Sequence, residues 1–374
     1  MTTLMAWRNL RQDPIRFAAT VIGIVFAVVL ISMQTGMLLG FMKTSAGLVE
    51  NAGADVWIMA RGTSNVDQSG LLNESAYYRA LTVDGVESVA RVVIQFSGWK
   101  RPDGGMESVI LVGFDPRTGM AAPWNIVEGS RDALLAPNAV MVDRLYADKL
   151  GVSKLGDRVE IVERMAVIAG FTSGVRTFTQ SPYVFTSYNN ALRYTNVQHG
   201  GASYMLVKAK PGVEPAMLAE RLGAVLTKEE VLTTSDFASR TRQYWILTTG
   251  AGSALIMGAA LGGLVGVIIV AQTLYSATVE RLAEYATLTA IGAGTGYLNR
   301  IVLTQSLIAG GIGFSVAAVI ASVLAASSAS SPAAVLLPPL AIATIGILTL
   351  ALCAIASLLA IRKLYTIDPT SVFR

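Results

Sequence analysis

The chain has 374 residues, of which 53% are hydrophobic and only 14% are charged, and its net charge is +4. Soluble domains carry about 25% charged residues, so a large part of this chain is expected to lie in lipid; its basic residues cluster beside apolar runs, which favours membrane orientation over nucleic-acid binding. The single cysteine, Cys353, excludes an intrachain disulfide, and the single histidine, His199, excludes most histidine-based metal and acid–base sites.

A basic segment, residues 1–16, precedes the first apolar run, residues 17–42. This uncharged run is about twice as long as the apolar core of a cleaved signal peptide, which spans roughly 7–15 residues. It therefore predicts a retained membrane span. Arg8, Arg11 and Arg16 precede the run and predict a cytoplasmic N-terminus, because basic residues remain on the cytoplasmic side.

Residues 43–243 differ in composition, because charges return and short β-rich runs alternate with turn signals. The expected strands are Asp55–Ala60, Ala90–Gly98, Ser108–Gly113, Arg158–Glu163, Ala166–Phe171, Pro182–Phe185 and Ser203–Lys208. The expected helices are Ala139–Leu150, Ser187–Tyr194 and Glu214–Leu226. The region has no obvious internal repeat or long linker, so it predicts one α+β extracytoplasmic domain, with room for two lobes.

The second apolar run, residues 244–277, opens on Tyr244 and Trp245 and is long enough to cross a bilayer with tilt. The polar segment that follows it, residues 278–300, predicts a cytoplasmic docking element. A return span is expected to begin directly after Arg300.

The third and fourth apolar runs, residues 301–326 and 336–361, predict two further spans. No Lys or Arg lies between them, whereas the C-terminal segment, residues 362–374, opens with Arg362 and Lys363. This asymmetry places both termini in the cytoplasm. The predicted fold is therefore an α-helical membrane protein with four transmembrane helices and an α+β extracytoplasmic domain inserted between the first and second.

Chemistry-bearing clusters are sparse. The four apolar runs contain no Asp, Glu, Lys or Arg, which argues against an ion-coupled transporter and against a polar substrate path through the bilayer. Asp115, Asp143 and Asp148 have no neighbouring His or nucleophile in the sequence, and we interpret them as turn and helix-surface residues. His199 lies in a Gln-His-Gly-Gly turn and is interpreted as a surface residue. No catalytic, cofactor-binding or metal-binding residue is expected.

Several short motifs follow one another in a set order along the chain: Val112–Pro116, Glu128-Gly129, Ala139–Gly151 with Gly156-Asp157, Val167–Phe171, Tyr183–Ser187, Leu206–Gly212, Glu280–Ala293 and Ile367–Thr370. Together they resemble the FtsX/MacB-type permease family of ABC transporters, and the resemblance covers nearly the whole chain. Within that family, the chain length and the early segment Gly53–Ile58 look most like DevC-type permeases. Those proteins work with an ATPase and a periplasmic adaptor to export glycolipids.

The resemblance implies a permease subunit of the cell inner membrane that is not itself an enzyme. The sequence contains no Gly-x-x-x-x-Gly-Lys-Ser/Thr phosphate loop, so ATP would be bound and hydrolysed by a separate partner chain. The implied partners are this ABC ATPase, a second copy of the permease, and a periplasmic membrane-fusion adaptor with an outer-membrane channel. The implied substrate is an amphiphile, such as a lipid, a glycolipid or a drug-like molecule.

The segment between the second and third spans is the strongest functional candidate. Glu280 and Glu284 are four residues apart on one helix face, and Arg281 lies three residues before Glu284. An ordinary solvated loop would also carry such charges. In the family a similar segment contains an Arg, a Glu and an Ala-Ile-Gly, so the resemblance implies that Glu280, Arg281, Glu284, Ala290, Ile291 and Gly292 dock on the ATPase.

Glycines four residues apart occur in the first and second spans and are typical of close helix packing. They are Gly36 and Gly40, and Gly258, Gly262 and Gly266. Two interpretations remain open, a permease–permease dimer face and packing between helices of one subunit.

Three functional classes are compatible with these features. The first is a transport subunit that converts ATP hydrolysis by its partner into motion of the extracytoplasmic domain. The second is an FtsX-like signalling subunit that activates an extracytoplasmic cell-wall hydrolase without transport. The third, a membrane-anchored enzyme, is disfavoured because catalytic clusters are missing.

Overall fold

The computed structural model describes residues 2–177, 179, 181–280, 295–328, 331 and 335–364. These residues form two compact units. A helical unit contains the described residues of 1–40, 253–329 and 334–374, and an α+β unit contains those of 41–252.

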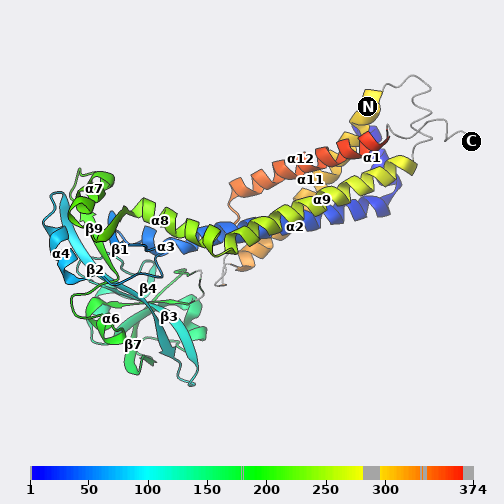
Figure 1. Ribbon diagram of the computed structural model, residues 1–374. Coiled ribbons are helices and arrows are strands. Elements are labelled where there is room, and N and C mark those ends of the chain that lie inside the picture. Colours follow the sequence, from blue (N-terminus) through cyan, green and yellow to red (C-terminus); the bar gives the residue numbers. More distant parts are fainter. Residues whose placement is uncertain are drawn as a thin grey trace, which may run out of the picture. The chain divides into compact units, whose positions relative to one another are not determined.

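The helical unit is built from long apolar helices (Figure 1). Its helices are α1 (Thr2–Gln12), α2 (Pro14–Ser45), α9 (Ala251–Glu280), α11 (Thr295–Ser327) and α12 (Pro339–Leu364). All except α1 are long and apolar enough to cross a membrane. The start of α2 follows from local sequence: Asp13 Oδ1 accepts the backbone N–H of Arg16 at 3.2 Å, and Pro14 is the first helical residue.

Small residues allow the long helices to approach one another. An ideal Cβ at Gly313 of α11 would lie 2.6 Å from Ile24 of α2, so these two helices are in close contact. The Ser306 hydroxyl of α11 donates to the carbonyl oxygen of Cys353 in α12 at 2.6 Å. This bond satisfies a polar group where no water is available. The helices share one apolar cluster of buried residues: Ile24, Val28, Ile31, Val270, Ala309, Ala317, Ile345, Cys353 and Ala356.

A ten-stranded sheet forms the α+β unit, in the order β10-β1-β9-β2-β3-β8-β5-β7-β4, with β6 paired to β2 and β7. The strands are β1 (Val56–Ala60), β2 (Val86–Lys100), β3 (Met106–Phe114), β4 (Ile126–Gly129), β5 (Ala139–Asp143), β6 (Arg158–Ile161), β7 (Arg164–Thr172), β8 (Tyr183–Ser187), β9 (Tyr204–Ala209) and β10 (Glu229–Thr233).

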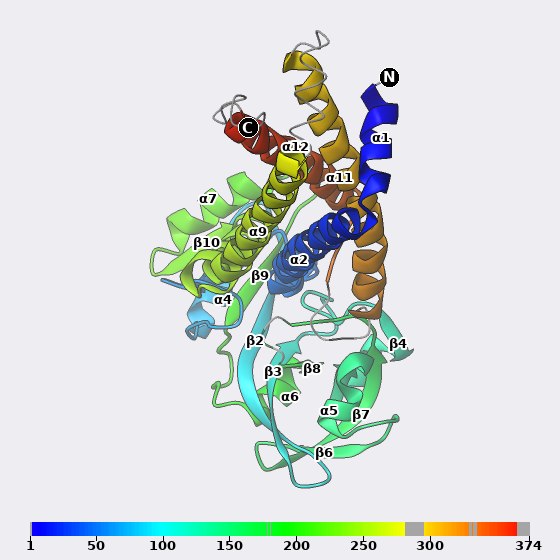
Figure 2. The same ribbon diagram turned by 90° about the vertical axis from the view of Figure 1, so that its right-hand side faces the viewer.

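The long strand β2 joins the two halves of this sheet (Figure 2). From Val86 to Val92 it pairs antiparallel with β9, and from Val93 to Lys100 it pairs antiparallel with β3. The first half therefore contains β10, β1 and β9, and the second contains β3, β8, β5, β7 and β4. One continuous backbone therefore takes part in both halves of the sheet.

Short helices cover the sheet: α3 (Gly47–Glu50), α4 (Glu74–Leu81), α5 (Ala147–Leu150), α6 (Tyr188–Tyr194), α7 (Pro215–Val225) and α8 (Thr234–Gln243). Two 3-10 turns, η1 (Arg131–Leu135) and η2 (Arg144–Tyr146), and a π-helical turn, η3 (Tyr244–Thr248), complete the described elements. In the first half, Ala76 and Ala80 of α4 and Leu218 and Leu222 of α7 are buried in one apolar cluster with β1 and β9. In the second half, Ala191 of α6 packs in another cluster with β3 and β8.

The sequence-based expectation of a helix over Ala139–Leu150 is wrong for its first part. Ala139–Asp143 forms strand β5, which lies parallel to β7 and antiparallel to β8. All five residues of β5 are buried, and a segment buried on both faces has no alternating pattern, so its periodicity does not distinguish a strand from a helix. Only Ala147–Leu150 is α-helical, and it ends at Gly151, which adopts a φ of 69°.

Candidate functional site

Most of the predicted ATPase-docking segment lies outside the described residues. Glu280 is the last residue of α9, whereas Arg281, Glu284, Ala290, Ile291 and Gly292 fall in the gap between residues 280 and 295. Their docking role stays a prediction.

The three predicted packing glycines of α9 all lie on its contact with α2. A Cβ added at any of them would be closer to an α2 side chain than Cβ atoms normally come. The added Cβ atom would lie 2.9 Å from Gln34 at Gly258, 3.1 Å from Leu30 at Gly262, and 2.8 Å from Ala27 at Gly266.

On α2, Gly36 is placed in the same way. A Cβ added there would lie 2.5 Å from Val335, and the Gly36 carbonyl oxygen accepts the backbone N–H of Leu336 at 2.9 Å. Gly40 is buried one turn later on the same helix. These are contacts within one chain, which is one of the two interpretations that the sequence left open; the role of these glycines in packing stays a prediction.

The other candidate site lies in the α+β unit at α8, the helix that precedes the second apolar helix in the chain. The Thr233 hydroxyl caps α8 by accepting the backbone N–H of Asp236 at 3.1 Å. One residue later, the Thr234 hydroxyl donates to the carbonyl oxygen of Ala54 at 2.6 Å, and its N–H donates to the carbonyl oxygen of Asp55. The start of α8 is thereby fixed to the entry of β1.

Ion pairs hold the remainder of α8. Arg242 pairs with Glu50 of α3, the short helix that follows α2. Two residues earlier, Arg240 pairs with Glu230 of β10 at 2.6 Å. Because α3 directly follows the first apolar helix and α8 precedes the second, the Arg242–Glu50 pair joins the two segments by which the chain enters and leaves the α+β unit.

The inner face of α8 is apolar and continues into η3. Phe237, Thr241 and Trp245 are four residues apart, so they share one face. Phe237 is buried, and its ring centroid lies 5.2 Å from that of Trp57 in β1 and 5.7 Å from that of Tyr204 in β9. These aromatic contacts dock α8 on the largest apolar cluster of the unit.

Trp245 at the end of this face and Tyr183 of β8 both act on the pKa of the buried Asp67 carboxyl group. Asp67 is 8% exposed and belongs to the loop between β1 and α4. Burial raises the pKa of this carboxyl group to about 6, whereas the influence of Tyr183 and Trp245 lowers it. The π-helical turn η3, which contains Trp245, and Gly250, with a φ of 76°, interrupt the helical path before α9 begins at Ala251.

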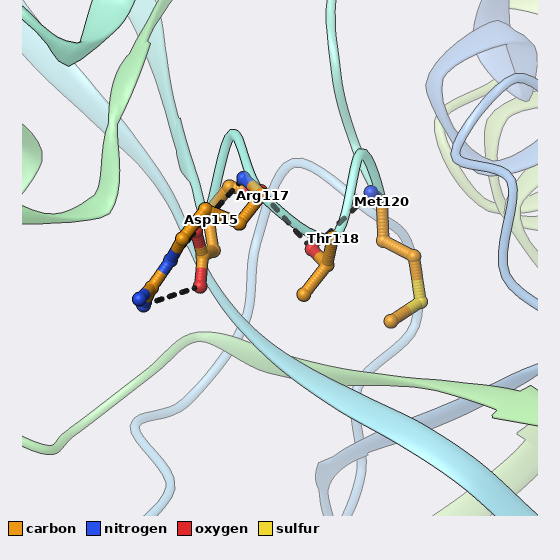
Figure 3. A network of polar contacts seen from close by, with 4 residues as sticks. All are labelled: Asp115, Arg117, Thr118 and Met120. Carbon is orange, nitrogen blue, oxygen red and sulfur yellow. Dashed lines mark hydrogen bonds and ion pairs between the residues drawn. The ribbon is translucent and has the colours of Figure 1, made fainter.

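A polar cleft of about 690 Å³ opens elsewhere on the α+β unit, among α4, β2, α6 and the turn after β3. Figure 3 shows that turn: the side chains of Asp115 and Arg117 face each other, and Thr118 accepts the backbone N–H of Met120. Burial raises the pKa of Asp115, but hydrogen bonds from Arg117 outweigh it and hold the pKa below its ordinary value.

The charges in the cleft largely neutralise one another. Glu74 pairs with Arg91 at 2.9 Å, as Asp115 does with Arg117 at 3.1 Å. The Arg91 guanidinium also stacks on Tyr77, 3.8 Å from the ring centroid. Arg193 also lines the cleft, so three arginines face two carboxylates in its lining.

The other aspartates and the histidine have structural or surface positions. Asp143 is buried, contrary to the sequence-based interpretation; its carboxylate accepts the Thr172 hydroxyl at 2.8 Å and the backbone N–H of Val175 at 2.7 Å. Asp148 and His199 are exposed, as expected. Within the described part of the chain, no three His, Cys, Asp or Glu side chains are grouped as a metal site would require.

Sequence reasoning missed Asp67, Glu50 and Arg242. None of them belongs to a motif, and Glu50 and Arg242 are separated by 192 residues. For Asp67, the sequence offered no more than its position shortly after the predicted first strand, Asp55–Ala60.

The comparisons with known proteins agree with this architecture. A family model described as MacB-like periplasmic core domain matches residues 17–225, and one described as FtsX-like permease C-terminal matches residues 256–369. A search of curated proteins gives no match.

Two of the solved structures to which part of this chain is similar are domains of transport proteins. The crystal structure of the periplasmic region of MacB from Actinobacillus actinomycetemcomitans has 14% sequence identity and a TM-score of 0.38, covering 50% of this chain and 92% of that one. The extracellular domain of the noncanonic ABC-type transporter YknZ from Gram-positive bacteria has 14% identity and a TM-score of 0.37, covering 48% of this chain and 98% of that one.

The first family model alone spans more than half of the chain, and the second covers most of the remainder. The α+β unit is accordingly a MacB-like periplasmic or extracellular domain between the first apolar helix and the later three. Membership also implies a partner ATPase. This chain belongs to the FtsX/MacB-type family of ABC transporter permeases and is the non-catalytic transmembrane subunit.

Proposed function

We propose that this permease transmits ATP-driven movement of its partner ATPase to its extracytoplasmic domain, and that this movement exports or extracts an amphiphilic substrate. The observation that carries the proposal is the attachment of α8: a capped N-terminus, two ion pairs and an aromatic face fix it to the sheet. A segment held at so many points acts as a lever and not as a flexible linker.

The apolar helices support a mechanism in which the substrate is handled outside the bilayer. Their uncharged runs offer nothing that would solvate a polar cargo. The cavity lined by Ile24, Gly266, Thr349 and neighbouring residues of the described helices has a volume of about 20 Å³ and is almost entirely apolar. It is far smaller than the roughly 300–1,000 Å³ of typical ligand sites.

The proposed assembly follows from the family and from the distribution of charge. The protein would lie in the cell inner membrane, and its basic flanks favour a cytoplasmic position for both termini. Two permeases would form a homodimer, and their extracytoplasmic domains would open and close against each other, passing the amphiphile to a periplasmic adaptor and an outer-membrane channel. The segment containing Glu280, Arg281, Glu284, Ala290, Ile291 and Gly292 would dock on the ATPase.

Reversal of charge at Glu284 tests the docking segment. The Glu284→Lys permease should insert normally but lose transport-stimulated ATP hydrolysis in the reconstituted complex, because the docking charge changes sign in a partly buried contact. Asp148→Lys, a reversal at an exposed position of the extracytoplasmic domain, is the control and should leave the stimulation intact. Normal stimulation by an assembled Glu284→Lys complex would remove Glu284 from the docking surface.

Locking the two extracytoplasmic domains together tests the transport mechanism. In a Cys353→Ser background, single cysteines at the exposed positions Leu71, Val127 and Leu155 are screened for disulfide formation between two copies. The cross-linked permease should stop exporting while basal ATP hydrolysis continues, and a reducing agent should restore export.

Export at the normal rate by fully cross-linked protein contradicts the mechanism. The FtsX-like alternative predicts a different phenotype. A deletion strain would then form chained cells because a cell-wall hydrolase stays inactive, and it would not accumulate a lipid or drug.

A further inference from the structure

The polar cleft of the α+β unit contains an arginine whose charge is not balanced by a neighbour. Arg193 of α6 lines the cleft and is exposed, and its guanidinium takes part in no ion pair or hydrogen bond with the described residues. The two carboxylates of the lining, Glu74 and Asp115, are each paired with another arginine. The cleft volume of about 690 Å³ falls within the roughly 300–1,000 Å³ of typical ligand sites.

The wall formed by α4 and β2 is held in place by the protein itself. Arg91 of β2 pairs with Glu74 of α4 at 2.9 Å and stacks on Tyr77, 3.8 Å from the ring centroid. The Glu74 carboxylate fits there because Gly200 has no side chain: a Cβ added at Gly200 would lie 2.6 Å from it. Gly200 also adopts a φ of 85°, which favours glycine. This wall is therefore formed before any ligand binds.

The turn after β3 presents a second arginine to the cleft (Figure 3). Arg117 is 84% exposed, and its Nε and Nη2 atoms donate to Asp115 Oδ1 and Oδ2 at 3.2 and 3.1 Å. The backbone N–H of Arg117 also donates to Asp115 Oδ1, at 3.0 Å, which fixes the turn. A guanidinium has five N–H groups, so this ion pair leaves donors available to a ligand.

The third wall is formed by α6 and the turn that follows it. The Tyr188 hydroxyl of α6 donates to the carbonyl oxygen of Gly201 at 2.6 Å, and the Gly201 N–H donates to the carbonyl oxygen of Gln198 at 2.9 Å. His199 lies within this turn, lines the cleft and is exposed. The turn is thereby fixed to the helix that carries Arg193.

The lining of the cleft also contains apolar side chains. Leu135, the last residue of η1, is 57% exposed, and Pro116 and Pro137 line the cleft with it. Arginine side chains present forked donors that match the oxygens of phosphate and carboxylate groups. An exposed leucine gains free energy when apolar surface covers it. A ligand that satisfies both requirements carries an oxyanion and a short apolar portion.

We propose that this cleft binds a small anionic amphiphile, whose phosphate or carboxylate group contacts Arg193 and Arg117 and whose apolar portion covers Leu135. The walls belong to both halves of the sheet, α4 and the start of β2 in the first and α6 with the turn after β3 in the second. A bound ligand therefore contacts both halves. The site narrows the proposed substrate to anionic amphiphiles and rests on the proposed function for its place in export, but binding can be measured without the ATPase.

Isothermal titration calorimetry tests the site on the full chain in nanodiscs of a zwitterionic lipid, with empty nanodiscs as the blank. The probes are hexyl phosphate, hexanoate, inorganic phosphate and the neutral hexyl glucoside. Hexyl phosphate or hexanoate should bind at least about tenfold more tightly than inorganic phosphate and hexyl glucoside, a difference of about 1.4 kcal/mol. The reason is that only these two probes engage the arginines and Leu135 together. The tighter of the two identifies the anionic group.

Substitutions in the cleft should change the affinity in both directions. Arg193→Gln should weaken binding of the tighter hexyl probe by about tenfold or more. Asp115→Asn should strengthen it, because a competing carboxylate is removed while the amide oxygen still accepts the backbone N–H of Arg117. Leu135→Ser should weaken binding of the hexyl probes but not of inorganic phosphate. Arg158→Gln, at an exposed position of β6 outside the cleft, is the matched control for charge and should leave every affinity unchanged.

Several results would overturn the site. They are no binding of either hexyl probe, equal binding of inorganic phosphate, equal binding of hexyl glucoside, and unchanged affinity in Arg193→Gln.

The complex with the partner ATPase separates failure of the site from failure of the proposed function. A hexyl probe that binds in the cleft but does not stimulate ATP hydrolysis would retain the site and refute its part in export. A permease that binds no probe but shows normal transport-stimulated ATP hydrolysis would refute the site and leave the proposed function standing.

Discussion

Gly113→Ala should destabilise the extracytoplasmic domain by about 1–3 kcal/mol or more, because it overpacks a contact that cannot relax. Gly113 lies in β3 beneath α6, and a Cβ added there would be 2.1 Å from the Cβ of Ala191. That neighbour is attached directly to the helix backbone, so α6 as a whole would have to move. With about 2–4 °C per kcal/mol for a domain of this size, thermal unfolding should shift down by several degrees.

A Gly→Ala substitution elsewhere in the domain should increase its stability. Nothing lies within 4 Å of a Cβ added at Gly223 in α7, so Gly223→Ala should stabilise by about 0.5–1 kcal/mol through helix propensity. The double substitution Gly113→Ala with Ala191→Gly moves the methyl group from helix to strand and should recover most of the lost stability. Unfolding followed by tryptophan fluorescence of the full chain measures all three. An unchanged midpoint for Gly113→Ala would show that α6 does not lie this close to β3.

Gly266→Leu should disrupt the helical unit, because it places a large side chain where α9 and α2 are closest. An ideal Cβ at Gly266 already lies 2.8 Å from Ala27 Cβ, and the adjacent cavity of about 20 Å³ cannot hold a leucine side chain. Overpacking of this kind costs about 1–3 kcal/mol or more. We expect a lower unfolding midpoint and a lower yield of monodisperse protein from detergent.

Gly311→Leu is the matched control for this prediction. Gly311 lies in the membrane helix α11, and nothing is within 4 Å of a Cβ added there. It should therefore tolerate leucine. Molecular mass in detergent separates the two interpretations of the α9 glycines: Gly266→Leu that dissociates a dimer into stable monomers would assign the face to permease–permease contact, whereas loss of stability in the monomer assigns it to the α2–α9 contact.

Much of the architecture was predictable, because a bilayer makes strict demands on sequence. Spans must be long, apolar and helical, and their flanking charges are asymmetric. The position of the inserted α+β domain follows from the return of charge after residue 42. Within that domain, strands with alternating burial or β-branched runs were recognisable, whereas β5 was mistaken for a helix because it is buried on both faces.

The start of the second apolar helix shows a similar limit. The apolar run begins at Tyr244, but the long helix begins only at Ala251, after the π-helical turn and the positive φ of Gly250. Hydropathy does not register such a break, because the residues on both sides are equally apolar. The interruption is a matter of backbone geometry, and it places Trp245 in the extracytoplasmic domain.

Sequence alone determined the membrane class, the four apolar runs, the inserted domain and, through the order of its motifs, the permease family. Each of these depends on composition, periodicity or local order, which a linear chain displays directly. Only the tertiary structure decided which residues join the parts. Glu50 meets Arg242 across 192 positions, and the Thr234 hydroxyl reaches the Ala54 carbonyl oxygen across 180 positions, because the sheet brings distant segments together. Long-range contacts of single polar side chains leave no periodic trace in sequence, so the attachments that would make α8 a lever became visible only in the fold.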